Sequence, residues 1–433
     1  MAKKYSLVPF VILTTIYFIV GFLTTVNGQM QAPLSATFLS EVETLRNTLI
    51  TLIPFFFFLG YLLNSSRAGG WINSLGYKRT LLRGLGFMLS SLLVYLCSAY
   101  MASSVGEQGV SLAGDFVPYG YMVFLLGSYL MGTSAAVLQV VINPYIASYE
   151  LPNTQPVQRV NIVCAINSFG TTIAPFFVTG VIFSGLAFDS VASSQLIMPF
   201  LVMSFFVAAV ILVTRTLSLP DIQGSSSSSE QLLTKSVWSF SHLRLGVIAI
   251  FFYVGAEVCI GVNVNLHAIE LAKIGEPLSF FGRENIVIAG LDLGIPALLA
   301  TLYWGGLMVG RLCSSFLNHL SARFQLVCTS VSAIVLTIIA ILTNNLWVLV
   351  SVGLCHSIMW GAVFTLAVKD LGIYTSKASG VFMMGVFGGA VFPLVQGFLA
   401  DKLGAWQYTW SLVIVCEVVI LYYAVIGSRI RNS

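Results

Sequence analysis

One acidic residue stands in the middle of an apolar segment and is the first place to look for chemistry. Glu257 lies within the apolar run 245–270, in the stretch Phe252–Gly261. At the rise of an α-helix this position is about 18 Å along the run, near the middle of a bilayer. A carboxyl group there either carries a proton or accepts hydrogen bonds from ligand hydroxyls. The alternative is a structural role as the partner of a nearby Asn or Tyr.

Amide and aromatic side chains in the apolar runs are the next candidates. An amide offers a donor and an acceptor together, as a ligand with a ring of hydroxyls requires. The amides are Asn27, Gln29, Gln139, Asn143, Asn161, Asn167, Asn263, Asn265 and Gln396. Flat apolar faces for a ring are available from Trp304, Trp360, Tyr253, Phe364 and Phe387. For each aromatic residue, packing or anchoring at the membrane interface is the alternative.

Two other acidic residues in the apolar runs are predicted to be structural, and one histidine is ambiguous. Glu417 lies in the last run, and the last helix of a bundle is expected outside a central path. Asp292 is predicted to begin a helix, where the helix dipole favours a negative charge. A lone His in an apolar helix, such as His356, is typical of a satisfied core residue.

The elements that position these residues are apolar runs of transmembrane length. The chain is 57% hydrophobic and 8% charged, against about a quarter charged in soluble domains. The runs fall at about 6–28, 46–64, 79–102, 118–146, 157–186, 195–215, 245–270, 289–318, 326–343, 346–368, 377–400 and 406–427. Since about 20 apolar residues cross a bilayer, the sequence predicts an all-α membrane protein with twelve transmembrane helices.

Composition and motifs exclude several classes of protein. The net charge of +4 comes from Lys and Arg scattered singly, which fits membrane topology better than binding to nucleic acid. The seven cysteines lie in apolar segments without a CxxC or a Cys/His cluster, so we interpret them as buried hydrophobes. The sequence has no G-x-x-x-x-G-K-[ST] and no G-x-S-x-G motif. We therefore expect a protein that is not an enzyme and that uses no cofactor or metal. Its energy source is expected to be a gradient.

The distribution of basic residues predicts the orientation. The run after Lys3-Lys4 is too long for a signal peptide and lacks its cleavage site, so we expect a retained first helix. With the amino terminus inside, sixteen of the twenty Lys and Arg residues, Arg311 among them, fall on the cytosolic side. Because basic residues accumulate in cytoplasmic loops, both termini are predicted to be cytoplasmic.

The chain divides into two related halves. A Ser-rich stretch after Pro220 reads as a flexible linker, which predicts an N-terminal bundle over 1–216, a linker over 217–243 and a C-terminal bundle over 244–433. Phe169-Gly170 with Pro175 in the fifth run matches Phe387-Gly388 with Pro393 in the eleventh. Residues 71–78 also resemble residues 316–323. Such repeats imply two six-helix bundles with a site between them at mid-membrane.

At these motifs the chain resembles the fucose/glucose/galactose permeases of the major facilitator superfamily. The motifs are Asn143-Pro144-Tyr145, Arg159-Val160-Asn161, Asn167-Ser168-Phe169-Gly170, Tyr253-Val254-Gly255-Ala256-Glu257 and Ser357-Ile358-Met359-Trp360. The resemblance implies the major facilitator fold in two six-helix pseudo-repeats, alternating access, and import of a monosaccharide coupled to a proton or, in some relatives, to sodium.

The chain departs from the family at the usual proton-carrying positions. Members typically have Asn-Asp late in the first helix, where this chain has Asn27-Gly28. The acid that some members place four residues before the Asn-Pro is Gln139 here. Gly361 follows Trp360 where relatives often have Pro. Proton coupling by Glu257, coupling to another ion, and an uncoupled facilitator therefore all stay open.

The sequence as a whole predicts a monomeric inner-membrane importer of a hexose or deoxyhexose, with Glu257 as the proton-coupling residue. The substrate-binding residues are predicted to be Asn27, Gln139, Asn143, Asn161, Asn167, Glu257, Asn263, Trp304, Trp360 and Gln396. The alternatives are a sugar receptor that does not transport, a channel, and a carrier of another solute such as a peptidoglycan fragment or a drug.

Overall fold

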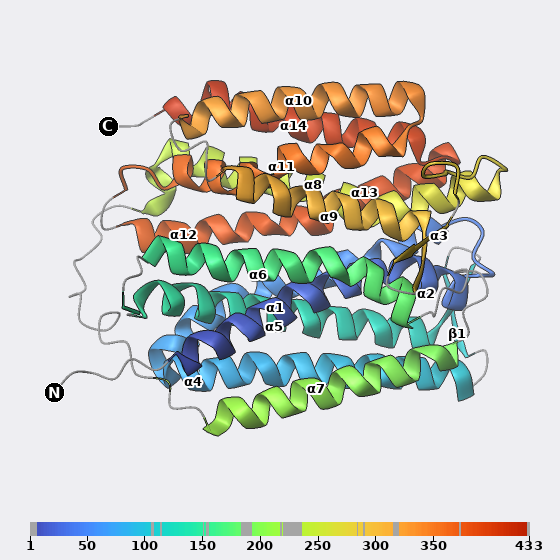
Figure 1. Cartoon of the computed structure of the whole chain (residues 1–433), viewed down its shortest axis with the longest axis horizontal. Coiled ribbons are helices and arrows are strands. Elements are labelled where there is room, and N and C mark those ends of the chain that lie inside the picture. Colours follow the sequence, from blue (N-terminus) through green and yellow to red (C-terminus); the bar gives the residue numbers. More distant parts are fainter. Residues whose placement is uncertain are drawn as a thin grey trace.

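The computed structural model shows a bundle of helices that run along one axis of the molecule (Figure 1). It describes residues 7–104, 108–112, 115–149, 151–152, 156–182, 193–216, 219, 236–283, 285–288, 291–314, 320–371 and 374–430. Most of the predicted linker, 217–243, lies outside these residues.

The N-terminal half comprises helices α1 to α7 and one β-hairpin. Its main elements are α1 (Val8–Gln29), α2 (Gln31–Phe38), α3 (Arg46–Ile50), α4 (Leu52–Ser104), β1 (Gly109–Leu112), β2 (Asp115–Pro118), α5 (Tyr119–Ser148), α6 (Pro156–Phe177) and α7 (Ile197–Thr216). A π-helix, Val178–Ile182, extends α6, and a 3₁₀ turn, Ser193–Leu196, precedes α7.

The C-terminal half comprises helices α8 to α14 and a second hairpin. Its main elements are α8 (Ser241–Lys273), β3 (Asn285–Ile288), β4 (Leu291–Gly294), α9 (Ile295–Ser314), α10 (Ala322–Thr343), α11 (Leu346–Ala367), α12 (Thr375–Met384), α13 (Gly388–Leu403) and α14 (Ser411–Val425). Short 3₁₀ turns lie at Val237–Ser239, Gly385–Phe387, Gln407–Trp410 and Gly427–Arg429.

The predicted number of membrane spans is confirmed. Within the described residues, twelve helices are long and apolar enough to cross a membrane. The second and third spans form the single element α4, which breaks at Gly76, where φ is 80° and glycine has no steric penalty. The prediction that Asp292 begins a helix is wrong, since it lies on β4 opposite Val287, and α9 begins at Ile295.

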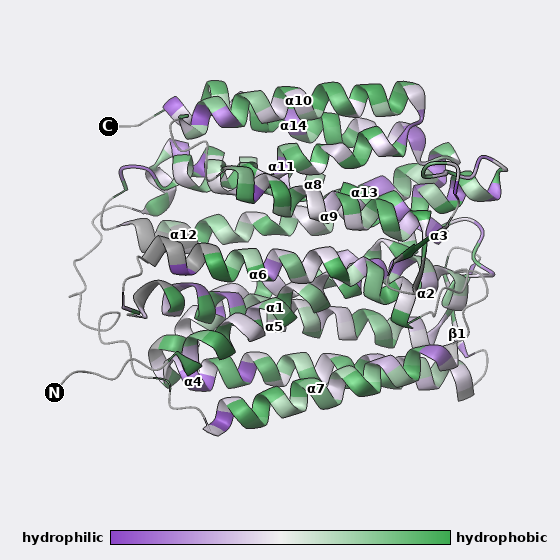
Figure 2. Cartoon of the chain, in the orientation of Figure 1, coloured by the Kyte–Doolittle hydropathy of each residue, from purple (hydrophilic) through white to green (hydrophobic). Residues whose placement is uncertain are grey.

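Hydropathy follows the length of the bundle. Hydrophobic residues cover most helical turns, and hydrophilic residues gather mainly at the two ends (Figure 2). We call the end where α1 begins and α14 finishes the terminal end, and the end with the two β-hairpins the hairpin end. This pattern is what a helix bundle in a bilayer requires.

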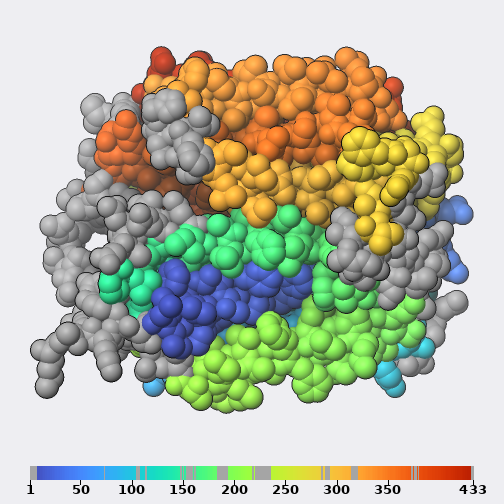
Figure 3. Space-filling view, viewed as in Figure 1, coloured from blue at the N-terminus to red at the C-terminus, as the bar shows by residue number. Residues whose placement is uncertain are grey.

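The two halves lie side by side in the bundle. Figure 3 shows the blue and green helices of the N-terminal half below the yellow to red helices of the C-terminal half. The halves meet where α6 packs against α9 and where α3 and α4 pack against α13.

The repeated Phe-Gly motif occupies equivalent places in the two halves. A Cβ atom on Gly170 would lie 2.7 Å from the Phe18 carbonyl oxygen of α1, and one on Gly388 would lie 1.7 Å from the Phe251 carbonyl oxygen of α8. In each half, the glycine thus lets the fifth span approach the backbone of the first span. The repeat read from the sequence therefore has a packing cause.

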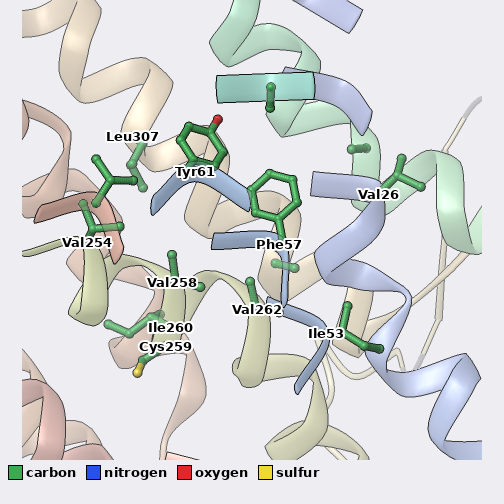
Figure 4. Packing of buried hydrophobic residues seen from close by; sticks show 14 of the residues in the cluster. Val26, Ile53, Phe57, Tyr61, Val254, Val258, Cys259, Ile260, Val262 and Leu307 are labelled. Atoms are coloured by element: carbon green, nitrogen blue, oxygen red, sulfur yellow. The ribbon is translucent and has the colours of Figure 1, made fainter. Parts of the chain in front are cut away.

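A continuous apolar cluster fills the space between the helices. Figure 4 shows Val254, Val258 and Val262 of α8 beside Phe57 and other apolar residues of the N-terminal half. A Cβ atom on Gly28 of α1 would lie 3.2 Å from Val262, so α1 and α8 touch across the two halves. Since this contact is made of small apolar side chains, polar groups stand out against it.

Candidate functional site

Glu257 lies at the centre of a polar group on α8. Its side chain is 12% exposed. Tyr253 precedes it by four residues and therefore lies on the same face of the helix. The Tyr253 hydroxyl is 3.1 Å from Glu257 Oε1 and 2.9 Å from the carbonyl oxygen of His356 on α11. One hydroxyl thus links the predicted proton-coupling residue to a second helix.

The number of protons in this group determines which hydrogen bonds can form. A backbone carbonyl only accepts, an ionised carboxylate only accepts, and the Tyr253 hydroxyl has one proton to donate. Both contacts are full hydrogen bonds only when Glu257 is protonated and donates to Tyr253, which then donates to His356. When Glu257 is ionised, the hydroxyl proton must be divided between two acceptors. The bond between α8 and α11 therefore depends on the proton on Glu257.

Arg311 of α9 connects Glu257 to the other half of the molecule. Its Nη2 is 3.9 Å from Glu257 Oε1, its Nη1 donates to Ser168 Oγ of α6 at 2.8 Å, and its Nε donates to the Ser357 carbonyl of α11 at 3.4 Å. An ionised Glu257 attracts the guanidinium, and a protonated one does not. The sequence predicts Arg311 on the cytosolic side; the residue lies in the last turn of α9, within its span, and its side chain bonds to α6 and α11.

The N-terminal half contributes neutral polar groups near this charged pair. Gln139 and Asn143 are four residues apart on α5 and so lie on one face. Gln139 Nε2 donates to the Tyr61 hydroxyl of α4 at 2.9 Å, and Tyr17 of α1 hydrogen-bonds to Asn143. Tyr17 also lies near Tyr61 and Arg311. The neutral groups of the N-terminal half thus lie across the boundary between the halves from the Glu257–Arg311 pair.

Two predicted aromatic platforms lie close to these groups. The Trp360 ring is 6.4 Å from the Tyr253 ring between centroids, in an edge-on arrangement. The Trp304 ring stands beside α8, where its Nε1 donates to the Gly261 carbonyl at 3.1 Å. Both tryptophans are partly buried. Each therefore keeps some ring surface that a ligand can contact.

Other predicted site residues are bonded to protein groups in this conformation. Asn27 accepts from the hydroxyls of Tyr95 and Ser128 within the N-terminal half. Asn167 donates to the Tyr17 carbonyl at 2.7 Å and joins α6 to α1.

Asn263 and Gln396 form a pair of their own. Asn263 Nδ2 donates to Gln396 Oε1 at 2.9 Å, Gln396 Nε2 donates to Thr409 at 3.2 Å, and both amides are fully buried. The structure thus joins α8 to α13 through this pair. Asn161 lies on α6, and its side chain falls outside the described part of the chain.

Comparison with known proteins places this arrangement in a family. No protein-family model matches the chain. The glucose/galactose transporter of Brucella abortus is 30% identical to it over 428 residues, which cover 96% of this chain and 93% of that protein. The chain belongs to the fucose/glucose/galactose permease family.

More distant members of this permease family agree. The L-fucose-proton symporter of Escherichia coli is 23% identical over 458 residues, which cover 99% of this chain and 94% of that protein. A crystal structure of the Escherichia coli fucose:proton symporter superposes with a TM-score of 0.63 at 21% identity, covering 98% of each chain. The predicted major facilitator fold is confirmed.

The permease has three site groups that the sequence reasoning missed, namely Arg311, Tyr17 and Tyr61. Arg311 had a signal, since it is a basic residue inside the apolar run 289–318, but it was interpreted only as a marker of the cytosolic side. Tyr17 and Tyr61 had none, because a tyrosine in an apolar helix looks like packing. No group of three or more potential metal ligands was found among the described residues.

Polar contacts also join the two halves of the permease at the hairpin end. Gln29 Nε2 donates to the Gly261 carbonyl at 3.0 Å and its Oε1 accepts from Asn265 at 3.1 Å. The Asp401 carboxylate of α13 accepts from the backbone N–H of Asn47 at 3.0 Å and of Thr48 at 2.7 Å, at the start of α3. These contacts hold the halves together at this end.

Proposed function

We propose that this chain imports a hexose such as glucose or galactose across the inner membrane and that proton binding at Glu257 drives the import. The observation that carries the proposal is the full-length relationship to a glucose/galactose transporter at 30% identity. The polar groups at the boundary between the halves support it, because amides, hydroxyls and a carboxylate suit a ring of sugar hydroxyls.

The sugar site in this proposal lies between α5 and the face of α8 that bears Glu257. Gln139 and Asn143 bind hydroxyls from one side, Glu257 binds them from the other, and Trp360 provides a flat apolar face. Trp304 lies at its edge, and Asn161 stays a predicted member of the set. Asn27, Asn167, Asn263 and Gln396 hold helices together, since each is hydrogen-bonded to protein groups.

Proton coupling in this proposal works through Arg311 and Tyr253. Protonation of Glu257 removes the charge that attracts Arg311, which also bonds Ser168 of the N-terminal half. The same proton lets the Tyr253 hydroxyl form two hydrogen bonds at once, one with Glu257 and one with the His356 carbonyl. One proton therefore weakens the contact of Glu257 with Arg311, the residue that bonds the N-terminal half, and strengthens the contact between α8 and α11.

Alternating access requires the halves to move against each other around this site. We propose that residues 1–216 and 244–433 are the moving units and that 217–243 links them on the cytosolic side. With both termini in the cytosol, the hairpin end faces outward, and the bonds of Asp401 and Gln29 to the other half break when the outer side opens. The chain acts as a monomer, since one copy supplies all of these groups.

An uncoupled sugar facilitator is the second candidate. The observation that favours it is the neutral pair Gly28 and Gln139 at the family's usual acidic positions. A facilitator exchanges sugar but does not accumulate it against a gradient. The two candidates therefore differ in energetics and share the substrate.

The test is transport by the purified protein in proteoliposomes. Labelled glucose, galactose and fucose are offered in counterflow, and accumulation is then measured with acid outside, with a sodium gradient, and with neither. Saturable counterflow and acid-driven accumulation are expected. Binding without counterflow would identify a receptor, flux without saturation a channel, and exchange of none of these sugars a carrier of another solute.

A further inference from the structure

A second ionisable pair lies deep in the C-terminal half, outside the sugar site. His356 of α11 and Glu417 of α14 are 2.8 Å apart between Nε2 and Oε1, and both side chains are 0% exposed. The other ring nitrogen, Nδ1 of His356, is 2.6 Å from the Tyr303 hydroxyl of α9. Three helices thus meet at one imidazole.

The hydrogen bonds of the pair are incomplete on one side. Both nitrogens of His356 are bonded, but Glu417 Oε2 is buried and has no hydrogen-bond partner among the described residues. A buried carboxylate that serves only as a structural tie normally has both oxygens satisfied, because an unpaired buried charge is costly. Glu417 therefore keeps one buried carboxylate oxygen that no described group satisfies.

The surroundings of the pair contain few other charges. The groups that interact with it electrostatically are Tyr253 and Glu257 from α8, Tyr303 from α9, Cys355 from α11 and Cys416 from α14. The single charged residue of α10 is Arg323, and it donates to Ser428 at the terminal end. Arg311 is the nearby cation, and it pairs with Glu257.

We propose that His356–Glu417 is a second proton-carrying site of the transport cycle, an inference that rests on the proposed proton-coupled function. In the loaded state the pair holds one proton and is neutral. On release, the N–H bond of the imidazolium breaks, the proton passes to water on the cytosolic side, and a neutral His356 and an ionised Glu417 remain. The backbone carbonyl of His356 accepts the hydrogen bond of Tyr253, which also contacts Glu257. A movement of α11 therefore acts on this pair and on Glu257 together.

The two sites are linked through His356, since its side chain acts electrostatically on Glu257 and its backbone carbonyl accepts from Tyr253, which also contacts Glu257. Protonation of both sites is then required for the fully loaded carrier. This arrangement supplies a second proton-carrying residue in a chain that has Gly28 and Gln139 where its relatives have acids.

The experiment measures protons taken up per sugar in proteoliposomes, with a trapped pH dye and the labelled hexose that the wild type exchanges. The variants are Glu417→Gln, His356→Gln, and Val413→Ala, a buried neighbour one turn before Glu417 on α14 that controls for packing. For Glu417→Gln we expect counterflow to persist while the proton-to-sugar ratio falls by about twofold, as loss of one of two coupled sites requires. Val413→Ala is expected to keep the wild-type ratio.

The outcomes separate this inference from the proposed function. An unchanged ratio in Glu417→Gln, with counterflow intact, would mean that the pair is structural and would overturn the inference alone. Wild-type exchange without proton uptake would overturn coupling at both sites, and no wild-type exchange would overturn the proposed function. If Glu417→Gln does not insert stably, the double variant His356→Gln with Glu417→Gln is used in its place, because two amides can still hydrogen-bond each other. The same proton-to-sugar ratio is then measured.

Discussion

The two halves of the molecule contribute different chemistry to mid-membrane. The N-terminal half offers neutral groups, represented by Gln139, Asn143 and the hydroxyls of Tyr17 and Tyr61. The C-terminal half holds the ionisable pairs Glu257–Arg311 and His356–Glu417. We propose that the N-terminal half recognises hydroxyls through neutral groups alone, whereas the C-terminal half both contacts the sugar and responds to protons. Substitutions in each half test that division.

The largest effect is expected from Arg311→Gln. The variant removes the charge that supports three contacts, with Glu257, Ser168 and the Ser357 carbonyl, and with them the described link from Glu257 to α6. Such bonds contribute about 1.5–3 kcal/mol. Because the Arg311 side chain is 39% exposed, the loss should lie near the lower end of this range, which corresponds to about a tenfold lower uptake. Arg311→Lys is the matched control, since it keeps the charge. Uptake within twofold of wild type in Arg311→Gln would contradict the proposed role of Arg311 in proton coupling.

A somewhat smaller effect is expected from Asn143→Ala. Loss of a neutral hydrogen bond to a sugar hydroxyl costs about 0.5–1.5 kcal/mol, which corresponds to about a 2- to 13-fold higher KM. The maximal rate and the pH dependence should stay unchanged, because no proton is involved. The measurement is counterflow at several sugar concentrations and pH values. A shifted pH profile would place coupling in the N-terminal half after all.

Tyr253→Phe is expected to change pH dependence more than affinity. The variant keeps the ring beside Trp360 but removes the hydroxyl that bonds Glu257 and the His356 carbonyl. One hydrogen bond of about 1 kcal/mol is lost, so sugar KM should change by less than about fivefold. Uptake measured from acid to alkaline pH should lose part of its steepness. A profile identical to that of wild type would remove Tyr253 from the coupling group.

The smallest effect is expected where both members of a structural pair are replaced. Asn263 and Gln396 bond each other inside the C-terminal half. Removing both polar partners with residues of similar shape is nearly neutral, so Asn263→Leu with Gln396→Met should leave KM within about twofold. Asn263→Ala alone should destabilise the protein by about 1–3 kcal/mol in thermal unfolding. A large rise in KM for the double variant would mean that both amides bind the sugar, as the sequence predicts.

The sequence was sufficient for the fold because its determinants are local. Twelve apolar runs and the Phe-Gly repeat depend on composition and spacing, and Gly170 and Gly388 turned out to sit against the first helix of their halves. The β-hairpins and the position of Asp292 were missed, since short strands in loops between spans leave little hydrophobic signal.

The candidate site was only partly predictable from the sequence. Glu257 could be found because a mid-span acid is rare. Arg311 was missed because a basic residue near a helix end normally reaches for water, whereas here it reaches Ser168 on a helix far away in the sequence. The pairing of His356 with Glu417 depends on how α11 meets α14, which no spacing within one helix reveals.

The most direct test of the central claim is acid-driven hexose accumulation by Glu257→Gln in proteoliposomes. Glutamine resembles the protonated carboxyl and cannot release a proton. We predict that the variant still exchanges sugar across the membrane, more slowly than wild type, and that its exchange no longer depends on pH through this residue. It should concentrate less sugar than the wild type when the outside is acidic, because only the second proton-carrying site is left. Accumulation equal to that of the wild type would contradict the proton role of Glu257.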